Sequence, residues 1–298
     1  MTQSARAVRR RPVFAINEVI KMATVKDLMN PNVFYAEVPS SREQVLKTLQ
    51  EKKISGIPVV KKGTKNLIGI ITREDLLRHS DEEQLALVMS TNVVTVSPET
   101  PFEECLKQMK EKRYRRLPVV SGNEIQGIIT VGDIVHKVIA TSSSNAKVKD
   151  FMKHAVFSCW GNTPVYIASK MMRMANEYVT LVIDNRENVA GIVSNTDLIR
   201  LVEINIEEKK SILKSSSESQ EWDWETSSVL YITKGKIALP NIPLHKVMSA
   251  PCITISETAS ITDCACNMQK FDIDQLPVTN AKDEIIGMIY DIDLIKSL

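Results

Sequence analysis

"GIITREDLL", residues 69–77, has the pattern of a buried strand that runs directly into a helix. The apolar run Gly69-Ile70-Ile71 ends at Thr72, and Asp75 follows three residues later. A threonine can cap a helix N-terminus, and an acidic side chain in the first turn interacts favourably with the helix dipole. The stretch therefore predicts a strand–helix junction. It also raises the question of whether Thr72 and Asp75 only cap the helix or hold a ligand as well.

The same junction recurs three times, at Gly127–Asp133, Gly191–Asp197 and Gly287–Asp293. Six residues separate the glycine from the aspartate in every copy. Each copy is preceded by a short segment that ends in methionine: Met29, Met89, Met152 and Met248. From this methionine to the junction glycine the spacing is 40, 38, 39 and 39 residues. A register held over four copies indicates an internal repeat.

Each repeat follows one order of elements. A short strand (93–96 in the second copy) precedes a helix with apolar residues at helical spacing. Two apolar strands follow, such as 57–60 and 67–71, and a second helix ends the unit. The order is β-α-β-β-α. A unit of about 60 residues buries little surface alone, so we expect the first to pair with the second and the third with the fourth.

The spacing of the repeats sets the expected domain boundaries. We expect a basic N-terminal arm, four units, a short linker and a longer inserted linker: 1–22, 23–80, 81–140, 141–147, 148–204, 205–241 and 242–298. The arm is either a disordered tail, a stretch upstream of a natural start at Met22, or a tether for nucleic acid or an acidic partner. The insert is either a mobile linker or a docking element that uses Trp222 and Trp224, and residues 227–240 have strand-like composition.

Composition is that of a globular protein: 298 residues, 43% hydrophobic, with a net charge of +2. No apolar run approaches the roughly 20 residues of a membrane span. Five cysteines without a C-x-x-C pattern, and no secretory signal, predict reduced thiols and a cytoplasmic location. Cys264 and Cys266 are two apart on a predicted helix, so one faces the core and one faces outward, and we expect no metal site. No catalytic motif is present, and we expect no enzymatic activity.

With its "LPVV"-like strand and "GIIT-x-x-D-L" junction, the repeat resembles the cystathionine-β-synthase (CBS) domain. This resemblance implies an α/β (α+β) fold in which four β-α-β-β-α units form two tandem pairs in a disc-like assembly. Proteins of this family commonly bind adenosine-containing ligands in clefts between paired units. They are usually regulatory rather than catalytic.

The resemblance also implies roles for the junction residues. The aspartate would hold the ribose, and the hydroxyl residue would lie near the phosphate, which gives the nucleotide-binding set Thr72, Asp75, Thr130, Asp133, Ser194, Asp197 and Asp293. The fourth copy departs from the pattern because Tyr290 replaces the small hydroxyl residue. A phenol is too bulky for a tight cap, so phosphate binding is in doubt there.

Two further groups complete the expected site. Arginine forks match phosphate oxygens, so the phosphate-binding candidates are Arg73, Arg113, Arg115 and Arg116. The resemblance places adenine beside the strand proline, so the pocket candidates are Ile57, Pro58, Leu117, Pro118, Leu276 and Pro277. The arginines belong to the first pair of units. We therefore expect that pair to bind the more phosphorylated ligand, and to bind it more tightly.

These observations favour a regulatory sensor of AMP, ADP or ATP that needs no cofactor. Ligand occupancy would change the packing of the units, or a homodimer contact, and so signal to an unidentified protein partner. S-adenosylmethionine is a variant ligand that the residues do not separate from the nucleotides. The alternative is a ligand-independent scaffold that binds protein or nucleic acid, and an enzyme acting on a nucleotide is the third hypothesis.

Overall fold

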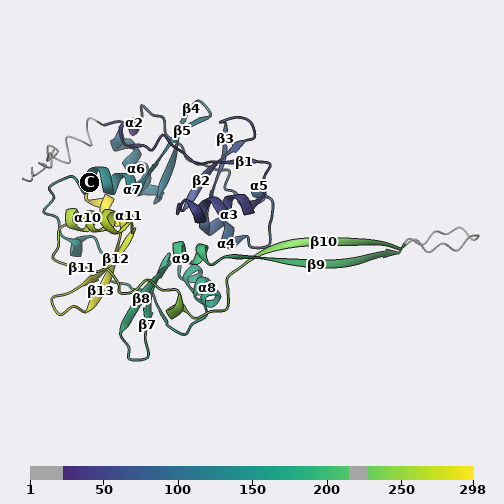
Figure 1. Cartoon of the computed structure of the whole chain (residues 1–298). Helices are drawn as coiled ribbons and strands as arrows, with labels where there is room; N and C mark the ends of the chain where they lie inside the picture. Colours follow the sequence, from purple (N-terminus) through teal and green to yellow (C-terminus); the bar gives the residue numbers. More distant parts are fainter. Residues whose placement is uncertain (1–22, 215–226) are drawn as a thin grey trace, which may run out of the picture. The chain divides into compact units, whose positions relative to one another are not determined.

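The computed structural model describes residues 23–214 and 227–298, and three of the four repeats have the complete predicted order of elements, the second lacking a full first strand (Figure 1). The N-terminal arm and the two tryptophans at 222 and 224 lie outside the described residues. The first repeat contains β1 (Ala36–Val38), α3 (Arg42–Glu51), β2 (Gly56–Lys61), β3 (Leu67–Thr72) and α4 (Arg73–Arg78). The third contains β6 (Ser158–Trp160), α8 (Val165–Ala175), β7 (Val179–Ile183), β8 (Val189–Ser194) and α9 (Asn195–Arg200).

The other two repeats differ in small ways. The second contains α6 (Phe102–Lys112), β4 (Arg116–Ser121), β5 (Glu124–Thr130), α7 (Val131–Ile134) and the π-helical turn η1 (Val135–Ile139). Its predicted first strand over 93–96 is reduced to one parallel bridge between Val96 and Val119. The fourth contains β11 (Ile255–Ser256), α10 (Ile261–Phe271), β12 (Gln275–Thr279), β13 (Ile285–Tyr290), α11 (Asp291–Leu294) and η4 (Ile295–Ser297).

Every repeat carries the same small sheet. The second strand pairs antiparallel with the third, and in three repeats the first strand pairs parallel with the second. Side chains alternate along a strand, so every second residue of a strand points to the same face of its sheet. On one face these residues pack against helices. In the first repeat Val45, Leu49, Ile57 and Ile71 form that core.

The chain divides into two compact units that do not follow the order of the repeats. One contains Val94–Val156 and Cys252–Leu298 with the described residues up to Val33, and the other contains Phe34–Val93 and Phe157–Pro251. The second repeat thus shares a core with the fourth, where α6 residues such as Phe102 and Met109 join α10 residues such as Cys264 and Met268. The first repeat lies in one unit with the third. The expected pairing of consecutive repeats stays a prediction.

Short opening segments precede the repeats: α2 (Val25–Leu28), α5 (Leu85–Val88), η2 (Val148–Asp150) and η3 (Leu244–Lys246). Each packs against the neighbouring repeat rather than its own. Asn30 exchanges two backbone hydrogen bonds with Ile128, at 2.8 and 3.0 Å, and Ser90 does the same with Ile70 at 2.9 Å. Lys153 pairs in this way with Met288, and Ser249 with Ile192.

This exchange explains the constant spacing between methionine and glycine. A Cβ on Gly127 would lie 2.7 Å from the sulfur of Met29, and one on Gly69 would lie 2.8 Å from the sulfur of Met89. Gly191 stands in the same relation to Met248. Only glycine leaves room for the methionine, so the two residues recur together although the contact joins different copies.

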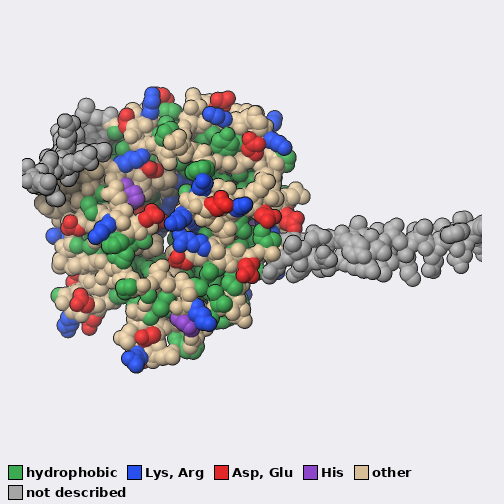
Figure 2. Space-filling view, in the orientation of Figure 1, with side chains coloured by type: hydrophobic (Ala, Val, Ile, Leu, Met, Phe, Trp, Pro, Cys, Tyr) green, Lys and Arg blue, Asp and Glu red, His purple; other side chains and the backbone are tan. Residues whose placement is uncertain are grey.

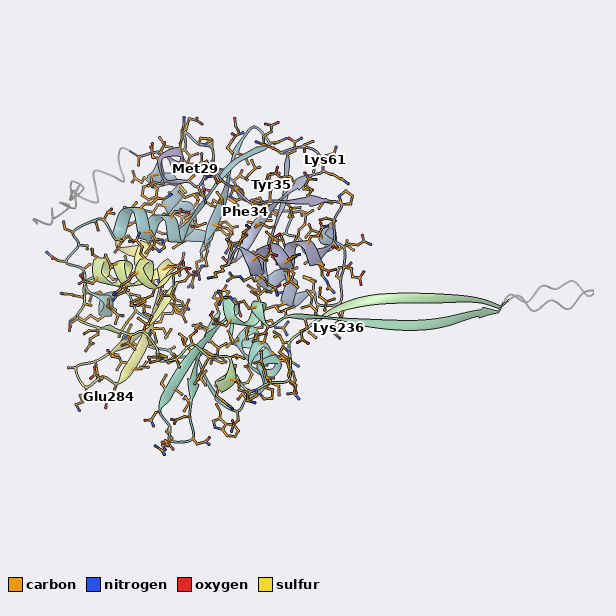
Figure 3. All side chains as sticks on the ribbon, viewed as in Figure 1. Met29, Phe34, Tyr35, Lys61, Lys236 and Glu284 are labelled. Carbon is orange, nitrogen blue, oxygen red and sulfur yellow. The ribbon has the colours of Figure 1, made fainter. Side chains whose placement is uncertain are left out.

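The insert is a two-stranded antiparallel hairpin, β9 (Glu203–Lys214) and β10 (Ser227–Ala238), as the strand-like composition of 227–240 indicated. At its base Ile237 joins the core of the first repeat and donates to the Ser80 carbonyl at 3.0 Å. Lys236, labelled at the base in Figure 3, forms an ion pair with Asp81 at 3.3 Å. The expected linker therefore contains an anchored element.

Candidate functional site

Three junctions contain the same hydrogen-bonded box at the start of the closing helix. In the first repeat the Thr72 amide and hydroxyl donate to Asp75 Oδ2 at 2.8 and 2.7 Å, and the Asp75 amide donates back to the hydroxyl at 3.3 Å. Thr130 with Asp133, and Ser194 with Asp197, repeat this arrangement. The capping function predicted from the sequence is confirmed at all three.

The box restricts what each group can still offer to a ligand. The hydroxyl proton is already donated to the carboxylate, so the hydroxyl has only acceptor capacity left. The first helical amide, that of Arg73, donates to the Ser55 carbonyl at 3.1 Å. The second carboxylate oxygen is the remaining strong acceptor. It has no partner at Asp75 in the described part of the chain, and it faces Lys137 at 3.1 Å in Asp133 and Arg200 at 3.9 Å in Asp197.

The fourth junction is built differently. Tyr290 makes no side-chain cap, as predicted from its size. The side chain of Asp293 is fully buried, and its Oδ1 accepts from Lys296 at 2.6 Å. Its Oδ2 has no hydrogen-bond partner among the described residues. Asp293 thus keeps its place in the sequence but not the partly exposed position of the other three aspartates.

The arginine candidates lie in four different environments. One terminal nitrogen of Arg115 donates to both carboxylate oxygens of Asp291 in the fourth repeat, each at 2.7 Å, and lies 3.4 Å from Asp274. Arg73 is buried and donates to the hydroxyl of Thr196 in the third repeat. Arg113 is exposed at the end of α6. Arg115 and Arg73 therefore already serve contacts between repeats of one compact unit.

Burial shifts the protonation of the partner of Arg115. Asp291 is 4% exposed. Its burial raises the pKa of the carboxyl group to about 6, although the positive charge of Arg115 opposes this shift. The repulsion from Asp274 adds to the effect of burial. Burial is thus the main cause of the raised pKa of Asp291, and the charge of Arg115 limits the rise.

Arg116 is the arginine candidate that lies directly beside a capping residue. In the β4–β5 ladder it stands opposite Thr130, and Pro118 stands opposite Ile128. Residues two apart on a strand point to the same side, so Arg116, Pro118 and Thr130 share the face of the sheet opposite the core side of Leu117, where Pro118 is itself buried. The residues equivalent to Arg116 in the other repeats are Gly56, Val179 and Gln275. A cation occupies this position in the second repeat only.

The six adenine-pocket candidates separate into two groups. Ile57, Leu117 and Leu276 belong to the helix-side cores of their repeats. The prolines at 58, 118 and 277 follow them directly and point to the opposite face. The core position favours the prolines over their aliphatic neighbours as contacts for a ligand.

Sequence reasoning missed Asp291 and Thr196 as partners of the arginines. Their positions in the repeat could have indicated them. Asp291 comes one residue after Tyr290 and Thr196 two residues after Ser194, and the same two positions carry Arg73 and Glu74 in α4.

No cluster of three or more His, Cys, Asp or Glu residues in the described ranges could hold a metal ion. None of the helices in those ranges is both long and apolar enough to cross a membrane.

Comparison with known proteins identifies the class. A model of the CBS domain matches residues 25–82, 84–140, 148–204 and 244–298, so the chain belongs to the CBS domain family and carries four copies of the domain. Among its relatives, MJ1404 of Methanocaldococcus jannaschii is 26% identical over 91% of this chain, which spans 61% of that protein. MJ1225 of the same organism is 23% identical over 91% of this chain and 97% of its own length.

Solved structures agree on the fold. The crystal structure of MJ1225 has a TM-score of 0.73 at 19% identity, covering 92% of this chain and 99% of that one. A conserved protein from Pyrococcus horikoshii has a TM-score of 0.61 at 26% identity, covering 92% and 99%. These structures place the four repeats in the fold of tandem CBS pairs.

Proposed function

We propose that this protein is a non-catalytic regulatory protein that binds adenosine-containing nucleotides at its strand–helix junctions. Membership of the CBS domain family supports a ligand-binding regulatory role. The observation that carries the proposal is the half-buried carboxylate of the junctions. One of its oxygens is fixed by the cap. The other has no partner at Asp75 among the described residues, and at Asp133 it pairs with Lys137 on one side only, so it can still accept hydrogen bonds from ribose hydroxyls, which are stronger when the acceptor is charged.

The second junction has the best chemistry for a phosphorylated ligand. Asp133 provides the carboxylate, Arg116 provides a cation opposite the capping Thr130, and Pro118 provides an apolar contact on the same face. The first junction has the free carboxylate oxygen of Asp75 but a glycine, Gly56, in place of the cation. We therefore expect the second junction to discriminate ATP or ADP from unphosphorylated adenosine, and the first to depend less on phosphate.

Signalling requires that the ligand bind two arrangements of the repeats with different affinity. Arg73 to Thr196 and Arg115 to Asp291 are contacts between repeats that begin within one or two residues of a junction. A ligand at the neighbouring junction would therefore act on the residues that join repeats within each compact unit. Binding of a ligand at a junction would in this way change how the repeats of one compact unit pack together.

The test is a titration of the full-length chain, because separate halves such as 1–146 and 147–298 would divide both compact units. AMP, ADP, ATP and S-adenosylmethionine are titrated by calorimetry against the native chain, Asp75→Asn and Asp133→Asn. Asparagine can still accept the cap hydrogen bonds but loses the second charged oxygen. We expect about 30-fold weaker binding, or about 2 kcal/mol, with little change in thermal stability.

Asp263→Asn is the matched control. Ser260 and Asp263 form the same box at the start of α10, with the hydroxyl donating at 2.6 Å, but away from the junctions. We expect that variant to bind like the native chain. Absence of binding by all four compounds, or equal binding by the native chain and the Asp75→Asn/Asp133→Asn double variant, would contradict the proposal.

Scaffolding on nucleic acid finds little support on the face shown in Figure 2. On the face shown in Figure 2, Lys and Arg side chains are interspersed with Asp and Glu. Binding of nucleic acid draws on clustered positive charge. We therefore favour nucleotide binding over a scaffold that binds nucleic acid.

A further inference from the structure

The first helices of the four repeats differ most at their outward positions. In α8 these positions carry Tyr166, Ile167, Met171 and Met174, which are 47, 38, 40 and 79% exposed. The equivalent positions carry polar or charged side chains in every other repeat: Glu43, Gln44, Thr48 and Glu51 in α3; Glu103, Glu104, Gln108 and Glu111 in α6; and Thr262, Asp263, Asn267 and Lys270 in α10. The third repeat alone presents an apolar outward face.

The exposed residues form one continuous stripe. Ile167, Met171 and Met174 follow the spacing of a single helix face, and Tyr178, 43% exposed, extends it beyond the end of α8. Contiguous apolar surface on a soluble protein marks an interaction site more often than scattered apolar residues do. Methionine side chains adapt readily to a partner. We call these four residues together with Tyr166 the α8 face.

Charge limits which partner can cover the α8 face. The exposed side chains of α8 include Lys170 and Arg173, and the helix contains no carboxylate. Two α8 helices packed against each other would bring these cations together, and that arrangement is unfavourable. An acidic segment with large apolar anchors is the complementary partner.

The chain itself contains such a segment. Residues 215–226 read SSSESQEWDWET, with four carboxylates, two tryptophans and no lysine or arginine. They lie outside the described residues, but the ends of the strands that flank them are fixed at Lys214 and Ser227. Buried tryptophan is among the most frequent anchors of protein interfaces.

The hairpin determines which copy of the segment can reach the α8 face. Twelve paired residues of about 3.3 Å each place Lys214 and Ser227 about 40 Å from the hairpin base. The base is anchored by Ile237 and Lys236, and β9 starts three residues after α9, which packs against α8. Figure 1 shows β9 and β10 extending away from the helices of the third repeat. A paired hairpin therefore carries its tip out of reach of its own α8.

We propose that residues 215–226 of a second copy of this chain dock on the α8 face, with Trp222 and Trp224 between the methionines and the carboxylates near Lys170. Two copies would exchange hairpins reciprocally and form a closed, two-fold dimer. This proposal does not depend on nucleotide binding.

Sedimentation velocity of the full chain between about 1 and 100 µM tests the proposal. We expect a concentration-dependent dimer in the native chain. Trp222→Ala/Trp224→Ala and Met171→Glu/Met174→Glu should each raise the dimer dissociation constant about tenfold or more. Gln44→Glu, at the exposed α3 position equivalent to Ile167, is the matched control and should leave it unchanged.

A charge exchange tests the pairing in trans. Lys170→Glu and Glu221→Lys/Asp223→Lys should each weaken self-association, and an equimolar mixture of the two variants should recover a heterodimer. Circular dichroism and thermal unfolding verify that each variant is folded. The tryptophan variant changes no residue of the described core, so it remains informative if the methionine variant unfolds. A native chain that stays monomeric at 100 µM, or a dimer unaffected by loss of both tryptophans, would overturn the proposal.

Discussion

The second and fourth junctions lie in one compact unit and share the glycine–aspartate spacing, yet their aspartates do different things. Asp133 is 18% exposed and is held by the amide and hydroxyl of Thr130. Asp293 is fully buried and is held by Lys296. The difference begins one position earlier in the motif, where threonine in one copy is tyrosine in the other.

A hydroxyl on a short side chain can reach the third amide of the helix and the carboxylate at once. A phenol places its oxygen too far from the backbone to do either. Tyr290 instead lies buried with Lys153 4.6 Å from its ring centre, and Asp291 next to it binds Arg115. The same spacing thus produces a ligand candidate in one repeat and a contact between repeats in the other.

The largest effect is expected from Arg115→Ala. Removal of the guanidinium leaves Asp291 buried without its counter-charge, and breaking one side of a buried pair costs about 3 kcal/mol. The midpoint of urea unfolding at pH 8 measures this loss. Arg113→Gln, at an exposed position two residues earlier, should change the free energy of unfolding by less than about 0.5 kcal/mol. The double variant Arg115→Ala/Asp291→Asn should recover most of the loss, and a double variant as unstable as Arg115→Ala would assign the loss to another contact.

The next effect concerns pH. Burial raises the pKa of Asp291 from 3.8 to about 6, so the folded chain holds this proton where the unfolded chain has already released it. The contribution of Asp291 to stability is therefore present below about pH 4, falls as pH rises to about 6 and stays low above that value. We expect a fall on the order of 2 kcal/mol.

Unfolding free energies of the native chain and Asp291→Asn, measured from pH 4 to 7, isolate this contribution as the difference between the two curves. The variant should lack the fall. Parallel curves would show that Asp291 ionises normally in the folded chain and that its burial has no effect on its titration.

Arg116→Gln separates the two junctions by charge. We expect ATP to bind about tenfold more weakly, because a charged hydrogen bond to phosphate is lost, while adenosine binds as before. The reverse change, Gln275→Arg, supplies a cation at the equivalent position of the fourth repeat. It should create no new ATP site, because Asp293 there is buried. A gain of ATP binding would mean that the cation alone decides, and the cap does not matter.

The comparison also shows how far the sequence could lead. The order of strands and helices, the three capping boxes and the lack of a cap at Tyr290 follow from local patterns, and the structure has them. The constant spacing between methionine and glycine was visible in the sequence, but the contact that causes it was not. Met29 contacts Gly127, in the next copy, and a pattern that is identical in every copy cannot indicate which copies touch.

The site was harder to predict for the same reason. Arg115 lies among other cations in "KEKRYRRLP", and its partner Asp291 is 176 residues away. Local sequence identifies a residue that can bind phosphate or carboxylate equally well, and only packing selects between them. The adenine candidates show a similar limit, since Leu117 and Pro118 are adjacent and equally apolar but point to opposite faces of β4.

The smallest effect sharpens the comparison at the cap itself. Thr130→Ala removes the hydroxyl that accepts from the Asp133 amide and donates to its carboxylate, and loss of such a cap costs about 1 kcal/mol. Thr130→Ser keeps the hydroxyl and should keep the stability. The alanine variant should also weaken nucleotide binding, because the Asp133 carboxylate then keeps its ion pair with Lys137 at 3.1 Å but loses the hydroxyl that fixes its other oxygen. Thermal unfolding and calorimetry on both variants test the two effects together. If alanine lowers stability but binding is unchanged, the cap serves only the helix, and the orientation of the carboxylate is set by its other neighbours.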